Sequence, residues 1–103
     1  MAVYLLHSTV PLVRESGREV RHYLGWCKDS RIHERLGDHD RGHCSSRIVQ
    51  AFISAGGLLL LGNYWPELTR EDERRMKRAG HLQAKCLHCE LEEVKRKIAE
   101  LPA

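Results

Sequence analysis

Three short apolar runs rich in strand-forming residues set the strongest limit on how this chain can fold. They span Val3–His7, His22–Cys27 and Leu58–Trp65. Runs of this length and composition, bounded by polar residues, Gly or Pro, are typical of β-strands. A polar stretch, Ser8–Val20, joins the first two runs and predicts a hairpin with a long loop. The third run, which Pro66 closes, is predicted to be a buried strand.

Two helices are predicted between the second and third runs. Asp29 or Ser30 can cap a helix from about Arg31 towards His39, because both side chains accept hydrogen bonds from N-terminal amides. Ser46 can cap the next helix, which Gly56 and Gly57 end. Apolar residues recur at helical spacing in this second helix, at Ile48, Ala51, Phe52 and Ala55.

A third helix is predicted after the last strand. Thr69 and Asp72 resemble a capping box ahead of a helix from Arg70 to about Arg78, which Gly80 ends. The order strand, strand, helix, helix, strand, helix predicts an α+β fold, with a small three-stranded antiparallel sheet flanked by helices. A length of 103 residues, 42% hydrophobic and 30% charged, fits one globular domain.

A further helix with a narrow apolar stripe is predicted at the C-terminus. We expect it to dock on the domain, and the seam of a homodimer is the alternative, although the stripe is shorter than a coiled coil needs. We therefore divide the chain into a domain of residues 1–89 and a helical extension of residues 90–103. The stripe consists of Leu91, Val94, Ile98 and Leu101.

The cellular compartment is also constrained by the sequence. The longest apolar stretch, Ala51–Leu61, is far shorter than the roughly 20 residues that a membrane span requires. No basic region precedes the first apolar run and no cleavage site follows it, so we expect a cytoplasmic protein with no membrane partner. Its 4 cysteines are then more often thiols or metal ligands than disulfides. The net charge of +3 permits a polyanionic partner without arguing for one.

Five residues are candidates for one functional site because of the chemistry of their side chains. Tyr4 and Tyr23 lie in consecutive predicted strands, so their rings can share one face, although packing is the commoner role. Arg35 and His39 share a helix face, which is either a solvated edge or a pair that binds phosphate and exchanges protons. Glu73 either pairs with a neighbouring lysine or holds Mg²⁺.

Taken together, these residues resemble the motifs of the GIY-YIG nuclease family. The name motifs correspond to Ala2-Val3-Tyr4 and Tyr23-Leu24-Gly25, and Arg35, His39 and Glu73 follow in the family's order. The likeness covers roughly residues 2–89 and is closest to small stand-alone bacterial members. Three features depart from the family. Ala2 replaces the first glycine, and the stretch before Arg35 is longer than usual, so Arg31 is the alternative to Arg35. The family's late asparagine has no clear counterpart, and Gln83 or His81 would take its place.

The resemblance implies a divalent-metal-dependent endonuclease that hydrolyses phosphodiester bonds in DNA through one metal ion. It implies Mg²⁺ or Mn²⁺ on Glu73, with Arg35 stabilising charge on the phosphoryl oxygens. Tyr4 is the favoured base, Tyr23 positions the water and His39 relays the proton, with the two tyrosines interchangeable. The residues expected to contact DNA, with structural or weak sequence preference, are Arg31, Arg74, Arg75, Lys77 and Arg78.

A Cys-x-x-Cys pair, Cys86 and Cys89, supplies half of a zinc site. We expect His43 or Cys44 as the first partners to test, and two reduced thiols are the alternative. The remaining candidate ligands are Cys27, His39, His81 and His88. Two other functions stay open: a non-catalytic nucleic-acid-binding member of the same fold, and a zinc-stabilised interaction module with the C-terminal stripe as its partner surface.

Overall fold

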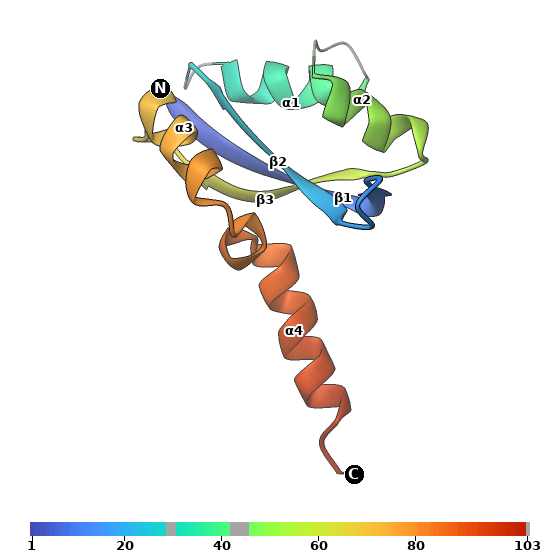
Figure 1. The fold of residues 1–103 in the computed structure, drawn as a ribbon. Helices are drawn as coiled ribbons and strands as arrows, with labels where there is room; N and C mark the ends of the chain where they lie inside the picture. Colours follow the sequence, from blue (N-terminus) through green and yellow to red (C-terminus); the bar gives the residue numbers. More distant parts are fainter. Residues whose placement is uncertain (29–30, 42–45, 103) are drawn as a thin grey trace.

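A three-stranded antiparallel sheet with helices on both faces forms the body of the protein (Figure 1). The computed structural model describes residues 1–28, 31–41 and 46–102. The strand order is β2-β1-β3, so the first strand lies in the middle. The predicted α+β class and the order of the elements are confirmed. The strands are β1 (Ala2–Val13), β2 (Glu19–Cys27) and β3 (Leu59–Trp65).

The helices begin and end close to the predicted signals. Ser46 caps the second helix through a hydrogen bond from the Val49 amide, and Thr69 and Asp72 form the predicted capping box of the third. Gly80 ends that third helix, as predicted. The cap expected at Asp29 or Ser30 lies outside the described residues. The helical elements are α1 (Ile32–Asp40), α2 (Arg47–Ser54), α3 (Arg70–Ala79), the 3₁₀ turn η2 (Leu82–Lys85) and α4 (Leu87–Ala99).

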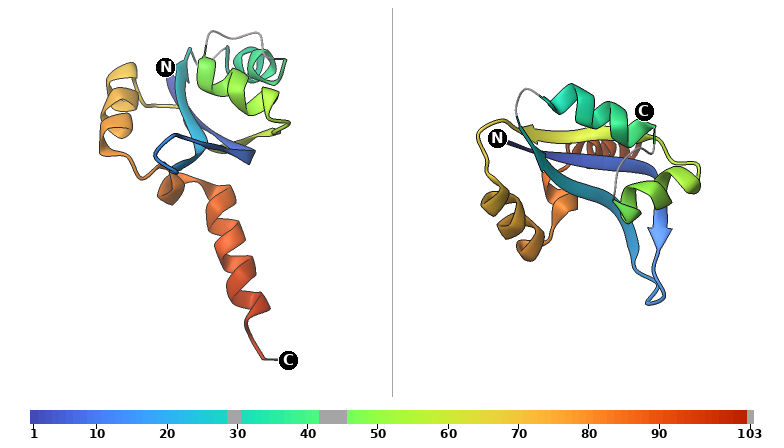
Figure 2. Two further views of the ribbon diagram at one scale, coloured as in Figure 1. Left: turned by 45° about the vertical axis from the view of Figure 1, so that its right-hand side comes forward. Right: turned by 90° about the horizontal axis from the view of Figure 1, so that it is seen from above.

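The hairpin between β1 and β2 differs from the prediction. Both strands continue far beyond the apolar runs, so the loop shrinks to Arg14–Arg18 and the hairpin extends past the sheet (Figure 2). The Arg14 amide donates to the Arg18 carbonyl at 2.9 Å, closing the turn. A register shift between His7 and Leu12 accommodates Pro11, which cannot donate to a ladder. The long loop was wrong because backbone pairing resumes beyond Pro11, where Leu12 pairs with Val20 and Val13 with Glu19.

The apolar core is divided between the two faces of the sheet. Successive side chains of a strand point to opposite faces, so Val3 and Leu5 pack under α3 and η2, whereas Tyr4 and Leu6 pack under α1 and α2. All four residues are at most 2% exposed. β1 is therefore buried on both faces, which explains its continuous apolar sequence.

β3 is less buried than its composition predicted. It pairs only with β1 and forms an edge of the sheet. Gly62 is its one buried residue, and Leu61 is 43% exposed. Apolar composition indicated a central strand, but the central position is taken by β1, so the prediction of a buried third strand was wrong.

α4 projects away from the sheet and does not dock on it (Figures 1 and 2). Every residue from Glu90 to Pro102 is exposed, including the four residues of the apolar stripe, so the expected docking was wrong. The predicted boundary between residues 89 and 90 falls inside this helix, which begins at Leu87. The homodimer seam stays a prediction. Among the described residues, no helix has the length and apolar character needed to cross a bilayer.

Two leucines test the division between the buried core and the exposed arm that α4 forms. Leu5→Ala should lower the free energy of unfolding by about 2–5 kcal/mol, because Leu5 is fully buried in the central strand. Leu91→Ala should change it by less than about 0.5 kcal/mol, because Leu91 is half exposed on the arm. Urea unfolding of both variants gives the comparison. A large loss at Leu91 would show that the arm packs on the domain or on a second copy, and a dependence on protein concentration would identify the copy.

Candidate functional site

Tyr4 and Tyr23 lie on neighbouring strands and on the same face of the sheet. Their ring centroids are 6.4 Å apart with an interplanar angle of 53°. Tyr4 is almost completely buried, whereas Tyr23 is half-buried. The antiparallel register places Tyr4 opposite Gly25 and Leu6 opposite Tyr23, so the two rings are diagonal neighbours.

Gly25 makes room for the phenol of Tyr4. A Cβ atom at Gly25 would lie 2.5 Å from both Cζ and Oη of Tyr4, and 3.0 Å from Cε1 of Tyr23. Contacts at 2.5 Å are far inside the normal separation of non-bonded atoms. Any side chain at position 25 would therefore displace the phenol, which gives a physical reason for glycine in the Tyr23-Leu24-Gly25 motif.

His39 lies against both tyrosines at the end of α1. Its Nε2 is 2.6 Å from Oη of Tyr4, and its ring centroid is 5.6 Å from that of Tyr4 and 5.5 Å from that of Tyr23. Burial lowers the pKa of His39, and the positive charge of Arg35 lowers it further. The imidazole is therefore neutral at neutral pH, with one ring nitrogen free to accept a proton. Its buried Nδ1 has no hydrogen-bond partner among the described residues.

Glu73 brings a carboxylate to the same place from α3. The residue is 4% exposed, and its Oε1 lies 2.7 Å from Nζ of Lys77, one helical turn later. The same ammonium group lies 5.7 Å from the ring centroid of Tyr23. Both roles that the sequence suggested for Glu73 are compatible with this geometry, because Lys77 neutralises a carboxylate that still faces the tyrosines.

These side chains line a cavity of about 330 Å³. All five residues proposed as catalytic, from Tyr4 to Glu73, contribute to it. Among the residues that the structure describes, four cationic side chains and a single carboxylate line this space, so its charge suits an anion such as a phosphate. The cationic residues are Arg35, Arg70, Arg74 and Lys77.

Arg70 was missed by the sequence analysis. Its guanidinium carbon lies 5.1 Å from the centroid of the Trp26 ring, which orients the side chain along the cavity wall. The sequence contained a signal for Arg70. Its spacing from Glu73, Arg74 and Lys77 is that of residues on one face of α3.

The other residues expected to contact DNA divide into two groups. Arg75 and Arg78 line a neighbouring hollow of about 450 Å³ that also includes Arg74 and Lys77, which makes the basic surface of α3 continuous with the cavity. Arg31 does not line the cavity and instead pairs with Glu34 at 2.6 Å. Neither Gln83 nor His81, the suggested substitutes for the family's asparagine, lines the cavity; both line a groove beyond α3.

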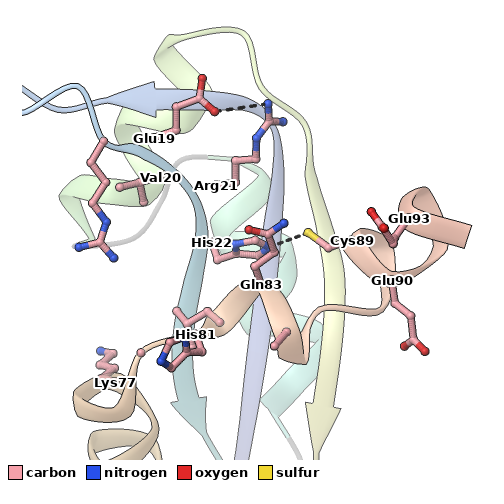
Figure 3. A pocket seen from close by; sticks show the side chains of 14 residues that line it. Glu19, Val20, Arg21, His22, Lys77, His81, Gln83, Cys89, Glu90 and Glu93 are labelled. Carbon is pink, nitrogen blue, oxygen red and sulfur yellow. Dashed lines mark hydrogen bonds and ion pairs between the residues drawn. The ribbon is translucent and has the colours of Figure 1, made fainter. Parts of the chain in front are cut away.

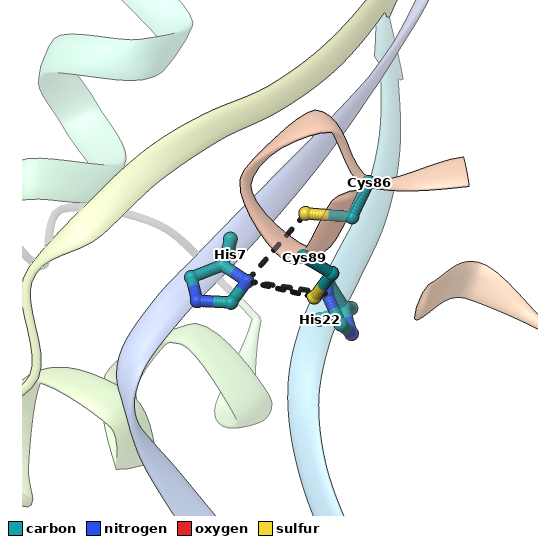
Figure 4. A group of neighbouring side chains, drawn as sticks. All are labelled: His7, His22, Cys86 and Cys89. Carbon is teal, nitrogen blue, oxygen red and sulfur yellow. Dashed lines mark hydrogen bonds between the residues drawn. The ribbon is translucent and has the colours of Figure 1, made fainter. Parts of the chain in front are cut away.

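A second cluster lies on the opposite face of the sheet (Figure 4). It brings together one ligand atom each from His7, His22, Cys86 and Cys89, all within 4.8 Å of one another, and could hold a metal ion. Cys86 and Cys89 were predicted as ligands, but both histidines were missed. The available signal was their position, since His7 ends the first apolar run and His22 begins the second, and hairpin pairing sets them opposite each other.

The other described residues that the sequence suggested as zinc ligands do not belong to this cluster. Cys27 packs with Tyr4 and Leu6 on the first face, and His39 contacts Tyr4. His43 and Cys44, the partners we expected first, lie outside the described residues. His88 is beside the cluster, with its ring centroid 5.7 Å from that of His7, but does not belong to it.

The second cluster opens onto a groove of about 960 Å³ between β2, η2 and α4 (Figure 3). Both His22 and Cys89 line this groove, so the cluster can be reached from solvent. Burial, followed by the charges of His7 and Arg21, lowers the pKa of His22 to about 4. Burial also lowers the pKa of His7 and, together with a hydrogen bond to Cys86, raises that of Cys89 to about 11. Without a metal, the cluster therefore has neutral imidazoles and a protonated Cys89 thiol.

Comparison with protein-family models, with curated proteins and with solved structures gives no significant match. The resemblance to the GIY-YIG family therefore rests on the sequence motifs alone.

The pKa of His39 can be tested directly. Its protonation midpoint, followed by NMR of the imidazole C–H signals, should lie below the ordinary value of 6.5. Because the folded pKa is depressed, His39 favours the folded state above pH 6.5, and this contribution is lost as the pH falls towards the folded pKa. Arg35→Gln should raise the midpoint, because it removes the second cause of the shift.

Arg31→Gln is the matched control, because Arg31 lies at the start of the same helix but pairs with Glu34. It should leave the His39 midpoint unchanged. A midpoint at or above 6.5 in the unmodified protein would contradict a buried, neutral imidazole.

Proposed function

We propose that this chain is a divalent-metal-dependent endonuclease that hydrolyses phosphodiester bonds in DNA, in the manner of the GIY-YIG family that it resembles. The observation that carries the proposal is the hydrogen bond between Tyr4 and His39 at one cavity that Glu73 and four cationic side chains also line. A phenol, an imidazole, a carboxylate and guanidinium groups that reach one small space are the parts that phosphodiester hydrolysis needs.

The nucleophilic water needs a base, and Tyr4 with His39 can provide one. An ordinary phenol is ionised to only about one part in 10³ at pH 7, so a lone tyrosine is a poor base. His39 is neutral and its Nε2 lies 2.6 Å from the phenol oxygen. As water attacks phosphorus, its proton passes to the Tyr4 oxygen and the phenol proton passes to His39. Tyr23, beside both rings, is placed to orient the water.

The cationic side chains are suited to the charge that builds on the phosphoryl oxygens. Arg35 and Arg70 approach the cavity from α1 and α3 respectively, so a phosphate between them would be held from two sides. Donors that are already oriented stabilise a transition state without reorganising, and removal of one such donor commonly costs roughly 3–4 kcal/mol. Arg74, Arg75, Lys77 and Arg78 extend the positive surface outwards, where a DNA backbone can follow it.

Glu73 is the residue that would hold the divalent cation. It is the one carboxylate among the described residues that line the cavity, and Mg²⁺ is commonly held by one or two protein carboxylates together with waters and substrate phosphates. Bound Mg²⁺ or Mn²⁺ would supply a Lewis acid for the scissile phosphate and the departing 3′ oxygen. Lys77 balances the carboxylate in the absence of a cation and would have to exchange partners when one binds.

The role of Glu73 can be separated from the general charge of α3. Glu73→Gln should reduce Mg²⁺-dependent nicking of supercoiled plasmid by at least about 100-fold, because the cation loses its protein ligand. Glu67→Gln, an exposed carboxylate just before the same helix that lines neither the cavity nor the neighbouring hollow, should cut normally. Thermal unfolding checks that both variants are folded. Full cutting by Glu73→Gln would refute the metal assignment, and binding without cutting in the unmodified protein would favour the non-catalytic alternative.

The role of Tyr4 can be tested by removing its hydroxyl alone. Tyr4→Phe keeps the buried ring and should reduce the cleavage rate by about 10²–10⁴-fold, the usual contribution of a general base. Tyr64→Phe is the matched control, because Tyr64 is the β3 partner of Tyr4, packs on the same face and lies outside the cavity. Equal cleavage rates for the two variants, measured at saturating Mg²⁺, would exclude Tyr4 as the base.

A further inference from the structure

We propose that a structural zinc ion fastens η2 and the start of α4 to the β1–β2 hairpin, through His7, His22, Cys86 and Cys89. The proposal is independent of the nuclease site, because the cluster lies on the other face of the sheet and shares no residue with the cavity.

Four of the six separations among the ligand atoms match a tetrahedral zinc site, and the two that involve Cys86 with Cys89 and with His22 lie within 4.8 Å. With zinc–sulfur bonds of about 2.3 Å and zinc–nitrogen bonds of about 2.05 Å, a regular tetrahedron separates two nitrogens by about 3.3 Å and nitrogen from sulfur by about 3.6 Å. Nδ1 of His7 and Nε2 of His22 are 3.2 Å apart. Sγ of Cys89 lies 3.3 Å from His22 and 3.6 Å from His7, and Sγ of Cys86 lies 3.5 Å from His7.

The donor set selects zinc and a structural role. Two thiolates and two imidazoles are soft or borderline ligands, which favour zinc over the hard cations Mg²⁺ and Ca²⁺. Four protein ligands complete a tetrahedron and leave no open position for water or substrate, so the ion would stabilise the fold and take no part in hydrolysis. Binding converts both thiols to thiolates and releases two protons to solvent, with no change in oxidation state.

The backbone is arranged to bring these atoms together. Hairpin register sets His7 opposite His22, and both side chains point to the face that η2 and α4 approach. Cys86 precedes α4 and Cys89 lies in its first turn. Gly62 of β3 allows Cys86 to come close, since a Cβ at that position would lie 2.9 Å from the Cys86 sulfur.

The fold gains most from a cross-link at this point. Within α4, only His88 and Cys89 are partly buried and every other residue is exposed, so the helix has little other contact with the sheet. A small domain has a limited core, and a metal that joins distant segments adds its binding free energy to folding. Loss of the ion should therefore free η2 and α4 before it affects the rest of the sheet.

The test measures metal content and the attachment of α4, without any nuclease assay. Full-length protein purified without chelators should contain about one zinc per chain by mass spectrometry of the elements. The metal-stripped protein should take up Co²⁺ with the strong visible absorption of a tetrahedral thiolate site. Stripping should also accelerate proteolytic cleavage between Gly80 and Cys89, and added Zn²⁺ should restore protection.

Matched variants distinguish ligands from bystanders. His22→Gln and Cys89→Ser should each lower zinc content at least tenfold, whereas His88→Gln and Cys27→Ser should retain it, because neither of these two residues belongs to the cluster. Where a ligand variant is unstable, Co²⁺ titration of stripped unmodified protein decides the matter alone. Zinc below a tenth of an equivalent with no tetrahedral Co²⁺ spectrum would overturn the proposal, as would full zinc retention by both ligand variants.

Discussion

The antiparallel register between β1 and β2 is the constraint on which both candidate sites depend. It sets Tyr4 opposite Gly25 on one face and His7 opposite His22 on the other. Side chains alternate between faces along a strand, so a shift of one residue would exchange the two sets and destroy both constellations. The buried, continuous apolar sequence of β1 opposes such a shift only weakly, because both of its faces are apolar. Gly25 contributes more specificity, since only that pairing leaves room for the Tyr4 phenol.

The sheet also separates two kinds of chemistry. On the side of Tyr4 and Tyr23, these phenols and the charged side chains of α1 and α3 line a cavity whose charge suits phosphate and a hard cation. On the other side, sulfur and imidazole nitrogen form a compact group whose spacing suits a softer ion. The two sets are held by the same pair of strands, yet each takes its remaining groups from different helices. Their metals, as proposed, would not compete for ligands.

Much of the fold followed from local sequence signals. Ser46 and the Thr69–Asp72 box mark helix starts because their hydrogen bonds are made with nearby amides, so tertiary structure is not needed to recognise them. The length of the hairpin could not be read in this way, because Pro11 interrupts the first strand and the pairing of Leu12 with Val20 beyond it has no local signal. The exposure of β3 depended on strand order, which composition does not encode.

The candidate sites show the same division. Arg35 and His39 share a helix face at a spacing visible in the sequence, and both reach the cavity. The partners of Cys86 and Cys89 come from residues about 65 to 80 positions earlier, and only the hairpin register brings them together. Adjacent histidines such as His88 were more conspicuous along the chain, but neighbouring positions on a helix point in different directions.

The ion pair between Glu73 and Lys77 has a consequence for how this protein is assembled. A buried acid without a counter-charge would oppose folding, and here the chain supplies its own cation one turn away. The cavity can therefore form before any ion from solution arrives, and it can lose that ion without collapse. Across the sheet, the thiols and imidazoles contact one another only through hydrogen bonds, which the proposed zinc would replace with stronger metal–ligand bonds. Loss of Mg²⁺ or Mn²⁺ would then abolish the proposed cleavage and leave the fold intact. Loss of zinc would instead loosen the attachment of η2 and α4 to the sheet.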